Sequence, residues 1–311
     1  MTDVVLTSTR NSNFSEKDIC DTVYRSLQAL PTIANAKPSS VIIKPNLCYY
    51  WDYSTGETTD PRIVSALIDY IRETFGKDTQ IVIAEADASA MKTRHAFKML
   101  GYEKLSKIKN VELVNLSKGK IIKREVSVNG EKFALAVNEL LLGSNFVLNV
   151  PKLKYHRLVG TTCALKNIYG AIATPNKYIY HSNLSKIIVA INKIVKSNLT
   201  LVDGIIALGK YPKKLGVTIA SDDALAADFT AAEILGYNPE RINYLKLAKR
   251  EKVGNVNNIN LIENETSLSD IKRLFPKKSY LWNKISWQLQ LAILKAYARL
   301  ADDVIPPVLE Q

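Results

Sequence analysis

Residues 147–170 read VLNVPKLKYHRLVGTTCALKNIYG. The stretch begins with a short apolar run that is typical of a buried strand, and it then turns basic. The residues that follow the apolar run include Lys152, Lys154, His156, Arg157, Lys166 and Asn167. In open α/β sheets ligands bind beyond the carboxyl ends of the strands, so polar residues directly after a strand are candidates for a binding site. The stretch therefore predicts a strand and a basic site that follows it.

Acidic residues are absent around this stretch. No Asp or Glu lies between Glu139 and Asp203, whereas residues 140–202 hold eight Lys or Arg and two His. Soluble surfaces usually mix charges of both signs, because unbalanced charge repels itself. We therefore expect a ligand to supply the missing negative charge. The net charge of +12 for the 311-residue chain does not decide this, because the Lys-rich composition of thermophilic proteins produces the same excess.

Apolar runs with strand character alternate along the chain with helical segments. The strand-like runs cover residues 4–9, 41–43, 80–84, 111–115, 145–150, 199–202, 217–220 and 257–262. This alternation predicts an α/β protein with a mainly parallel sheet and helices on both faces. The pair Asn129-Gly130 between apolar alternating runs predicts one inserted β-hairpin, and Asp203-Gly204 is expected to end a strand.

The pattern becomes wholly helical beyond Glu265. We expect an α/β domain over residues 1–265 and a helical C-terminal extension over residues 266–311. Residues 279–303 predict a helix with a broad apolar surface that includes two Trp. Packing on its own domain, a homodimer interface and reversible association with a membrane surface are the three interpretations of that helix.

The candidate site residues are those that lie at or after the carboxyl ends of the predicted strands. Lys152 and Lys154 alternate, so on an extended chain both face one side, and His156 continues that side. Lys is a compact binder of phosphate or carboxylate, and His exchanges a proton near neutral pH. The alternative interpretation is that these residues have no ligand and only form turns or a basic loop exposed to solvent. The predicted substrate-binding residues are Lys44, Asn46, Lys152, Lys154, Asn167 and His181, and the predicted catalytic residues are His156 and Lys166.

A divalent metal is a second interpretation of the acids that follow strands. Glu85, Asp87 and Asp203, with Asp228, supply oxygen ligands of the kind that such a cation prefers. The three cysteines are far apart and form no CxxC, so we expect no iron–sulfur cluster held by this chain. The sequence contains neither GxxxxGK(S/T) nor GxGxxG, so it has no Walker loop and no dinucleotide-binding fingerprint. For Cys163, a buried small side chain is favoured over a thiol of lowered pKa.

Six segments resemble the family catalogued as "domain of unknown function" number 362. They are VIIKPN (41–46), GETTDPRIVSAL (56–67), VIAEAD (82–87), VPKLKYHRLVGTTCALKNIYG (150–170), LTLVDG (199–204) and ASDDALAADFTAAEILG (220–236). The resemblance supports Lys44, Asn46, Lys152, Lys154, His156, Lys166 and Asn167 as site residues. Many relatives carry a ferredoxin-like segment with four-cysteine cluster motifs, which this chain lacks. The layout is also similar, more distantly and in fold alone, to the N-terminal half of nickel-dependent lactate racemases.

Three functions remain open at this point. The favoured one is an enzyme, of unassigned reaction class, that binds a small anionic metabolite through its lysines. A nucleic-acid-binding protein that uses the same charge is the first alternative, although no nucleic-acid-binding signature is present. A non-catalytic or redox-partner subunit related to iron–sulfur family members is the second. Reduced thiols, the lack of a signal-peptide pattern and the lack of an apolar run of ~20 residues predict a cytoplasmic protein without a transmembrane segment.

Overall fold

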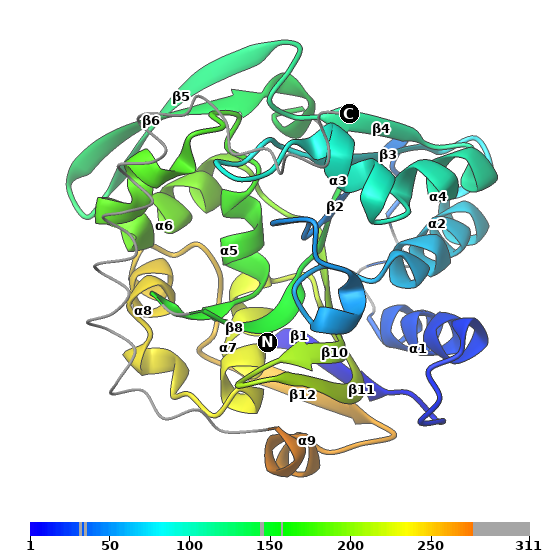
Figure 1. Ribbon diagram of the computed structural model, residues 1–311. Helices are drawn as coiled ribbons and strands as arrows, with labels where there is room; N and C mark the ends of the chain where they lie inside the picture. The colour runs from blue at the N-terminus through cyan, green and yellow to red at the C-terminus, as the bar shows by residue number, and fades with distance from the viewer. Residues whose placement is uncertain (31–32, 34–35, 144–145, 157, 276–311) are drawn as a thin grey trace.

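A ten-stranded sheet forms the centre of the computed structural model, which describes residues 1–30, 33, 36–143, 146–156 and 158–275 (Figure 1). Eight of its strands follow the order β12-β1-β11-β10-β7-β2-β3-β4, and β8 pairs with both β10 and β9. The strands are β1 (Thr2–Ser8), β2 (Ser40–Pro45), β3 (Gln80–Glu85), β4 (Glu112–Asn115), β7 (Phe146–Val150), β8 (Lys152–His156), β9 (Gly160–Thr162), β10 (Leu199–Leu208), β11 (Pro212–Ser221) and β12 (Ile259–Asn264). The strands β10, β7, β2, β3 and β4 are parallel, as predicted.

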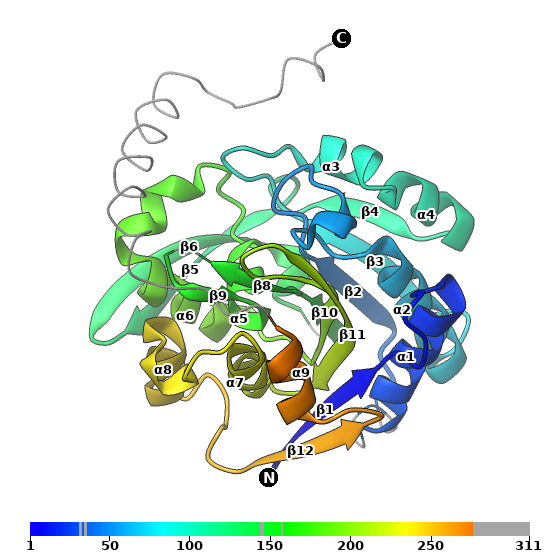
Figure 2. The same cartoon turned by 60° about the horizontal axis from the view of Figure 1, so that its bottom comes forward.

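Helices cover both faces of the sheet, which confirms the predicted class (Figures 1 and 2). The helices are α1 (Glu16–Gln28), α2 (Pro61–Phe75), α3 (Thr93–Met99), α4 (Tyr102–Lys109), α5 (Ala164–Tyr169), α6 (Leu184–Ile194), α7 (Ala224–Ile234), α8 (Asn243–Arg250) and α9 (Leu268–Leu274). Successive residues of a strand point to opposite faces. Ile43 therefore packs in the core with α1 and α2, whereas Ile42 packs in the core with α5 and α6.

The predicted hairpin is present as a separate two-stranded sheet. It consists of β5 (Ile121–Val128) and β6 (Glu131–Asn138). Asn129 and Gly130 at its tip both have positive φ, as a tight two-residue turn requires. Figure 1 shows the hairpin beside α6, away from the central sheet.

The strand that was expected to end at Asp203-Gly204 continues instead to Leu208. It then turns back as β11, which runs antiparallel to both β10 and β1. The prediction was wrong because a carboxylate followed by glycine is typical of a strand end. Here Asp203 is buried in mid-strand beside an ammonium group that neutralises it.

The chain beyond Glu265 is described only as far as residue 275. Within that part, Ile271 of α9 and the following Phe275 pack into the same core as Val4 and Ile219 of the sheet. The predicted helix over 279–303 lies outside the described residues, so the boundary near Glu265 stays a prediction. None of the helices in the described ranges is long and apolar enough to cross a membrane.

Candidate functional site

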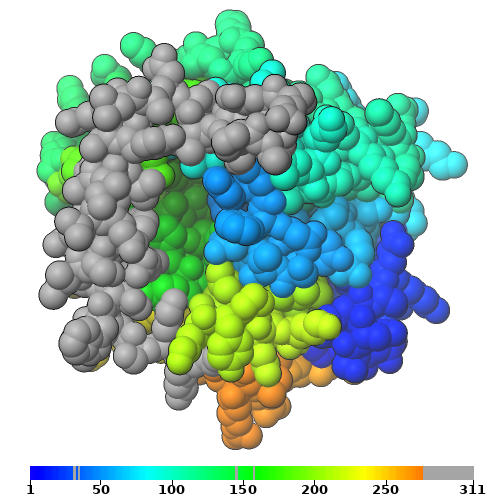
Figure 3. All heavy atoms as spheres, viewed as in Figure 1, coloured from blue at the N-terminus to red at the C-terminus, as the bar shows by residue number. Residues whose placement is uncertain are grey.

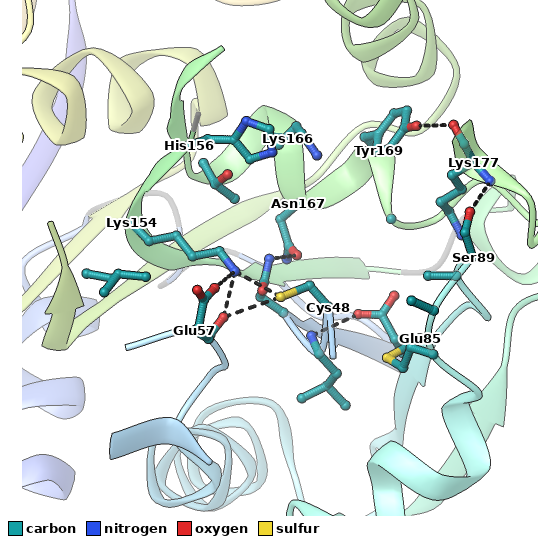
Figure 4. Close-up of a pocket in the computed structure, with 18 of the residues that line it drawn as sticks. Cys48, Glu57, Glu85, Ser89, Lys154, His156, Lys166, Asn167, Tyr169 and Lys177 are labelled. Atoms are coloured by element: carbon teal, nitrogen blue, oxygen red, sulfur yellow. Dashed lines mark hydrogen bonds and ion pairs between the residues drawn. The ribbon is translucent and has the colours of Figure 1, made fainter. Parts of the chain in front are cut away.

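A cavity of about 540 Å³ lies at the carboxyl ends of β2, β3 and β8 (Figures 3 and 4). In Figure 3 the surface is hollowed between the blue segment that follows β2 and the green segment of β8 and α5. The 3-10 helix η4 (Lys177–Asn183) and the turn after β10 complete its wall. The charged and titratable residues of the wall include Lys44, Cys48, Glu57, Glu85, Lys154, His156, Lys166, Lys177, His181 and Lys210.

A buried ion pair joins the ends of β2 and β3 at this cavity. The Nζ of Lys44 donates to both carboxylate oxygens of Glu85, at 2.8 Å each. The same carboxylate accepts the backbone N–H groups of Leu47 at 3.2 Å and Ala86 at 2.9 Å. Glu85 is therefore saturated by donors of the protein, and it orders both segments that follow the strands.

Side-chain amides connect α5 to the same strands. The Nδ2 of Asn167 donates to the Oδ1 of Asn149 at 2.8 Å and to the carbonyl of Lys44 at 3.2 Å. The Nδ2 of Asn46 donates to the Oδ1 of Asn167 at 3.0 Å. A Cβ at Gly170 would lie 2.9 Å from the carbonyl of Asn167 and 3.1 Å from the Nζ of Lys44. Only glycine lets the helix end approach the ion pair so closely.

Asp228 of α7 holds the first turn of α5. Its carboxylate accepts the backbone N–H groups of Ala164 and Leu165 and lies 3.5 Å from the hydroxyl of Tyr244. Burial raises the pKa of Asp228 to about 7, against the opposing effect of those donors. Cys163 is also buried there, and burial raises its pKa well above the usual value, so a thiol of lowered pKa is excluded.

Lys154 points into the cavity and is held by the loop that follows β2. Its Nζ lies 2.9 Å from the Sγ of Cys48, 3.0 Å from a carboxylate oxygen of Glu57 and 2.7 Å from the carbonyl of Glu57 (Figure 4). Burial disfavours the ammonium form of Lys154, but Cys48 and Glu57 outweigh burial and raise its pKa. Neither partner belonged to the predicted site, because that loop has no periodic pattern.

Lys152 does not line the cavity, although it alternates with Lys154. Its side chain is fully buried, and its Nζ donates to the Oδ2 of Asp203 at 2.8 Å. That oxygen also accepts the backbone N–H of Asp60 at 2.8 Å. Lys152 therefore has a structural partner beneath the site instead of a free position facing a ligand.

His156 lies on the wall beside Lys166 (Figure 4). Its Nδ1 accepts the backbone N–H of Leu158 at 3.2 Å. Burial, together with the nearby charges of Lys166 and Lys154, lowers the pKa of His156 well below its usual value. The ring is therefore neutral at physiological pH, and its hydrogen resides on Nε2, where it can be donated. His181 lies on the same wall and packs edge-on against Tyr178, with ring centroids 5.1 Å apart.

Three lysines of the cavity lack a carboxylate partner among the described residues, namely the exposed Lys210 and the more buried Lys166 and Lys177. Lys166 places its Nζ over the ring of Tyr169, 4.5 Å from the centroid, and burial followed by repulsion from Lys154 lowers its pKa to about 8. Lys177 donates to the carbonyl of Asp87, and burial lowers its pKa to about 7. Lys177 was not predicted as a site residue; its only signal was its place in the acid-free window.

The acids nominated for a metal are not brought together. Glu85 pairs with Lys44, Asp203 pairs with Lys152, and Asp87 accepts the backbone N–H of Thr93 at 2.8 Å. The described residues contain no group of three or more His, Cys, Asp or Glu that could hold a metal ion.

The cysteines do not fit an iron–sulfur cluster either. Cys48 lies at the cavity, Cys20 lies on α1, and Cys163 lies in the core. No four-cysteine ligand set can form from three residues in three different places.

The structure thus brings most of the predicted residues to one cavity. Lys44, Asn46, Glu85, Lys154, His156, Lys166, Asn167 and His181 all line it. Lys152, Asp87 and Asp203 are absent from its described wall, and Arg157 lies outside the described residues.

These residues fall in segments that match a known family. The family model described as "Domain of unknown function (DUF362)" matches residues 41–233. The chain belongs to this family. It is 25% identical over 261 residues to the thylakoid-associated protein sll1697 of Synechocystis sp., and the match covers 79% of this chain and 78% of that protein.

A solved structure is similar over part of its length. The lactate racemase apoprotein from Thermoanaerobacterium thermosaccharolyticum matches with a TM-score of 0.43 and 14% identity. The match covers 76% of this chain but only 57% of the racemase, so this chain spans less than two thirds of that protein.

The Lys152–Asp203 pair predicts a clear effect on stability. Lys152→Met leaves the Asp203 carboxylate buried without its cation and should lower the free energy of unfolding by about 3–5 kcal/mol. The double variant Lys152→Met/Asp203→Asn removes the uncompensated charge and should recover part of that loss. Urea denaturation measures both. The exposed pair Lys249–Glu240 is the control, and Lys249→Met should cost no more than about 1 kcal/mol. Equal losses for Lys152→Met and Lys249→Met would contradict the assignment.

Asp228 predicts a pH dependence of stability. Its pKa in the folded protein, about 7, is higher than the value of about 3.9 expected in the unfolded chain. The folded state therefore binds more protons between these values, and the free energy of unfolding should fall as pH rises from about 4 to about 7. Asp228→Asn cannot titrate and should lose that part of the slope, whereas Asp78→Asn on the exposed surface should keep it. Denaturant titrations at several pH values measure the slope, and an unchanged slope in Asp228→Asn would refute the prediction.

Proposed function

We propose that this chain binds a small anionic metabolite, bearing a phosphate or a carboxylate, in the cavity described above. The observation that supports it best is Lys166, whose Nζ lies at the cavity without a carboxylate partner among the described residues. Lys166 is half-buried, and an ammonium group that is partly removed from water is stabilised by an anion, which the described protein does not supply here. A bound anion satisfies that need.

The charge of the wall supports the same proposal. Its described part carries five lysines and two glutamates, and both glutamates are already paired, Glu85 with Lys44 and Glu57 with Lys154. Lys166, Lys177 and Lys210 are left without a carboxylate partner among the described residues. A phosphate monoester carries close to two negative charges near neutral pH and suits such a surplus.

Neutral groups on the wall complete a site for oxygen-rich ligands. The Nε2–H of His156 can donate to a ligand oxygen, as follows from the acceptor role of its Nδ1. The Oγ1 of Thr162 and the Oδ1 of Asn46 are buried and have no hydrogen-bond partner in the part of the chain that the structure describes. Buried polar groups are seldom left unsatisfied, so these two atoms favour a polar ligand in contact with them.

An enzyme that acts on this metabolite is the favoured form of the proposal, with His156 and Lys166 in contact with the reacting group. Nucleic acid is the alternative partner for the same charge. Of the window lysines that face the cavity, Lys154 and Lys177 are buried and Lys166 is half-buried, whereas a nucleic-acid backbone is usually met by exposed Lys and Arg along one face. We therefore expect only weak binding to duplex DNA, with a steep loss as salt rises.

The charge of Lys166 can be tested directly by isothermal titration calorimetry with a phosphate monoester. Lys166→Met should weaken binding about tenfold to hundredfold, because a hydrogen bond to a charged group contributes about 1.5–3 kcal/mol. The wild-type affinity should also fall between about pH 7 and about pH 9, as the ammonium of Lys166 with pKa about 8 loses its proton while the ligand stays dianionic. Lys166→Arg keeps its charge at both pH values and should lose the part of this fall that is centred near 8.

Lys196→Met is the matched control for that experiment. Lys196 lies in the same acid-free window but is exposed on the surface. Its variant should bind as the wild type does. Equal affinity of Lys166→Met and wild type, or tight binding of duplex DNA at physiological salt, would overturn the proposal.

A further inference from the structure

The lysines around the cavity differ in what their Nζ atoms contact. Four of them donate to an oxygen of the protein: Lys44 to Glu85, Lys152 to Asp203, Lys154 to Glu57 and Lys177 to the carbonyl of Asp87. The carboxylates favour the ammonium forms of Lys44, Lys152 and Lys154, and an ammonium group has no free electron pair and is a poor nucleophile. Lys177 differs from these three, because burial lowers its pKa to about 7, and its Nζ is held by the carbonyl of Asp87.

Lys166 differs from these four, and it also differs from Lys210, the remaining lysine of the described wall, which is exposed. The Nζ of Lys166 has no oxygen acceptor among the described residues and rests on the face of Tyr169. Helix α5 holds it there, because Asp228 caps the first turn and Asn167 fastens the helix to the ends of β2 and β7. The amine thus occupies a fixed position on the cavity wall.

The surroundings of Lys166 favour its neutral form. Burial and the neighbouring ammonium groups of Lys154 and Lys44 lower its pKa to about 8, although Cys48 opposes them. At about pH 7.5 roughly a quarter of such amines are neutral, against about one in a thousand for an exposed lysine. A lysine that is partly desolvated, as the half-buried Lys166 is, and lies beside other cations is in the arrangement that activates an amine for attack on a carbonyl.

We propose that the Lys166 amine forms an imine with an aldehyde or ketone group of the anionic metabolite. This inference rests on the proposed function, and it narrows the ligand to a phosphate or carboxylate that also carries a carbonyl. The Nζ electron pair forms a bond to the carbonyl carbon, and the C=O π bond breaks to give a carbinolamine. One proton from the nitrogen and one from solvent reach the oxygen, which leaves as water, and the nitrogen electron pair forms the C=N bond of a protonated imine that keeps the second N–H hydrogen.

The groups beside Lys166 suit this step. The Nε2–H of His156 can donate a hydrogen bond to the carbonyl oxygen and so polarise the bond under attack. Lys177 and Lys210 lie on the same wall without a carboxylate partner among the described residues, and they can hold the anionic part of the ligand. Binding of the anion and attack on the carbonyl are thus assigned to different lysines.

Reductive trapping tests the proposal. The probe is pyridoxal 5′-phosphate, which combines an aldehyde with a phosphate monoester, and sodium borohydride reduces any imine to a stable amine. With equimolar probe at about pH 7.5, intact mass and peptide mapping should place the adduct mainly on Lys166. Lys166→Arg retains the positive charge but cannot form an imine, and it should lose the adduct at least tenfold. Lys196→Arg should be labelled as the wild type is.

A second probe separates the two proposals. Pyridoxine 5′-phosphate carries an alcohol in place of the aldehyde, so it reports binding of the anion alone. If it binds and pyridoxal 5′-phosphate gives no adduct on Lys166, the imine is rejected while the anion site stands. If neither probe binds, both proposals fail. Labelling spread evenly over surface lysines, or undiminished in Lys166→Arg, also overturns the imine. A parallel reaction with pyruvate and borohydride shows whether a carboxylate can take the place of the phosphate.

Discussion

The buried ion pair between Lys44 and Glu85 is the interaction on which the site depends. It neutralises two charges at the ends of neighbouring parallel strands, where neither could remain alone. The carboxylate also takes the backbone N–H groups of Leu47 and Ala86, so both loops leave their strands in fixed directions. Gly170 has no side chain, and α5 can therefore end directly against this pair. The positions of the groups on α5 follow from that contact.

Most positive charge near the cavity is balanced by acids from distant parts of the chain. The window over residues 140–202 contains no acid, yet Glu57 reaches Lys154 and Asp203 reaches Lys152. A segment without Asp or Glu in the sequence can therefore still have carboxylates beside its lysines in the folded protein. Lys166 and Lys177 are the two lysines of this window that line the described cavity without such a partner. The argument for an anionic ligand rests on these two and not on the window as a whole.

Strand polarity was sufficient to predict much of the fold and part of the site. Lys44, Lys154 and His156 converge because each lies at or near the carboxyl end of a strand in one sheet. The antiparallel return of β11 was missed because Asp203 and Gly204 imitate a strand end, and only the buried partner Lys152 shows why the strand continues.

The contributions of irregular segments could not be predicted. Cys48 and Glu57 belong to a loop without periodicity, and Lys177 begins a 3-10 helix. Such segments are placed by tertiary contacts, for example the hydrogen bond from the backbone N–H of Lys177 to the Oγ of Ser89. Secondary-structure propensity depends on neighbouring residues in the sequence, so it does not predict contacts between residues that are far apart in the chain.

The hydrogen bond from Leu158 to His156 changes which residue is suited to move a proton. The sequence favoured His156, because an ordinary histidine titrates near neutral pH. In the structure its Nδ1 is an acceptor, and burial beside two lysines keeps the ring neutral. To act as a base, Nε2 would have to lose its hydrogen while Nδ1 gained one, and the bond from Leu158 would break. Lys166, with a pKa of about 8 and no oxygen acceptor among the described residues, can lose and regain its proton near neutral pH without breaking such a bond. Under the proposed function, His156 is therefore the fixed donor to the ligand oxygen, and Lys166 is the group that changes its protonation state.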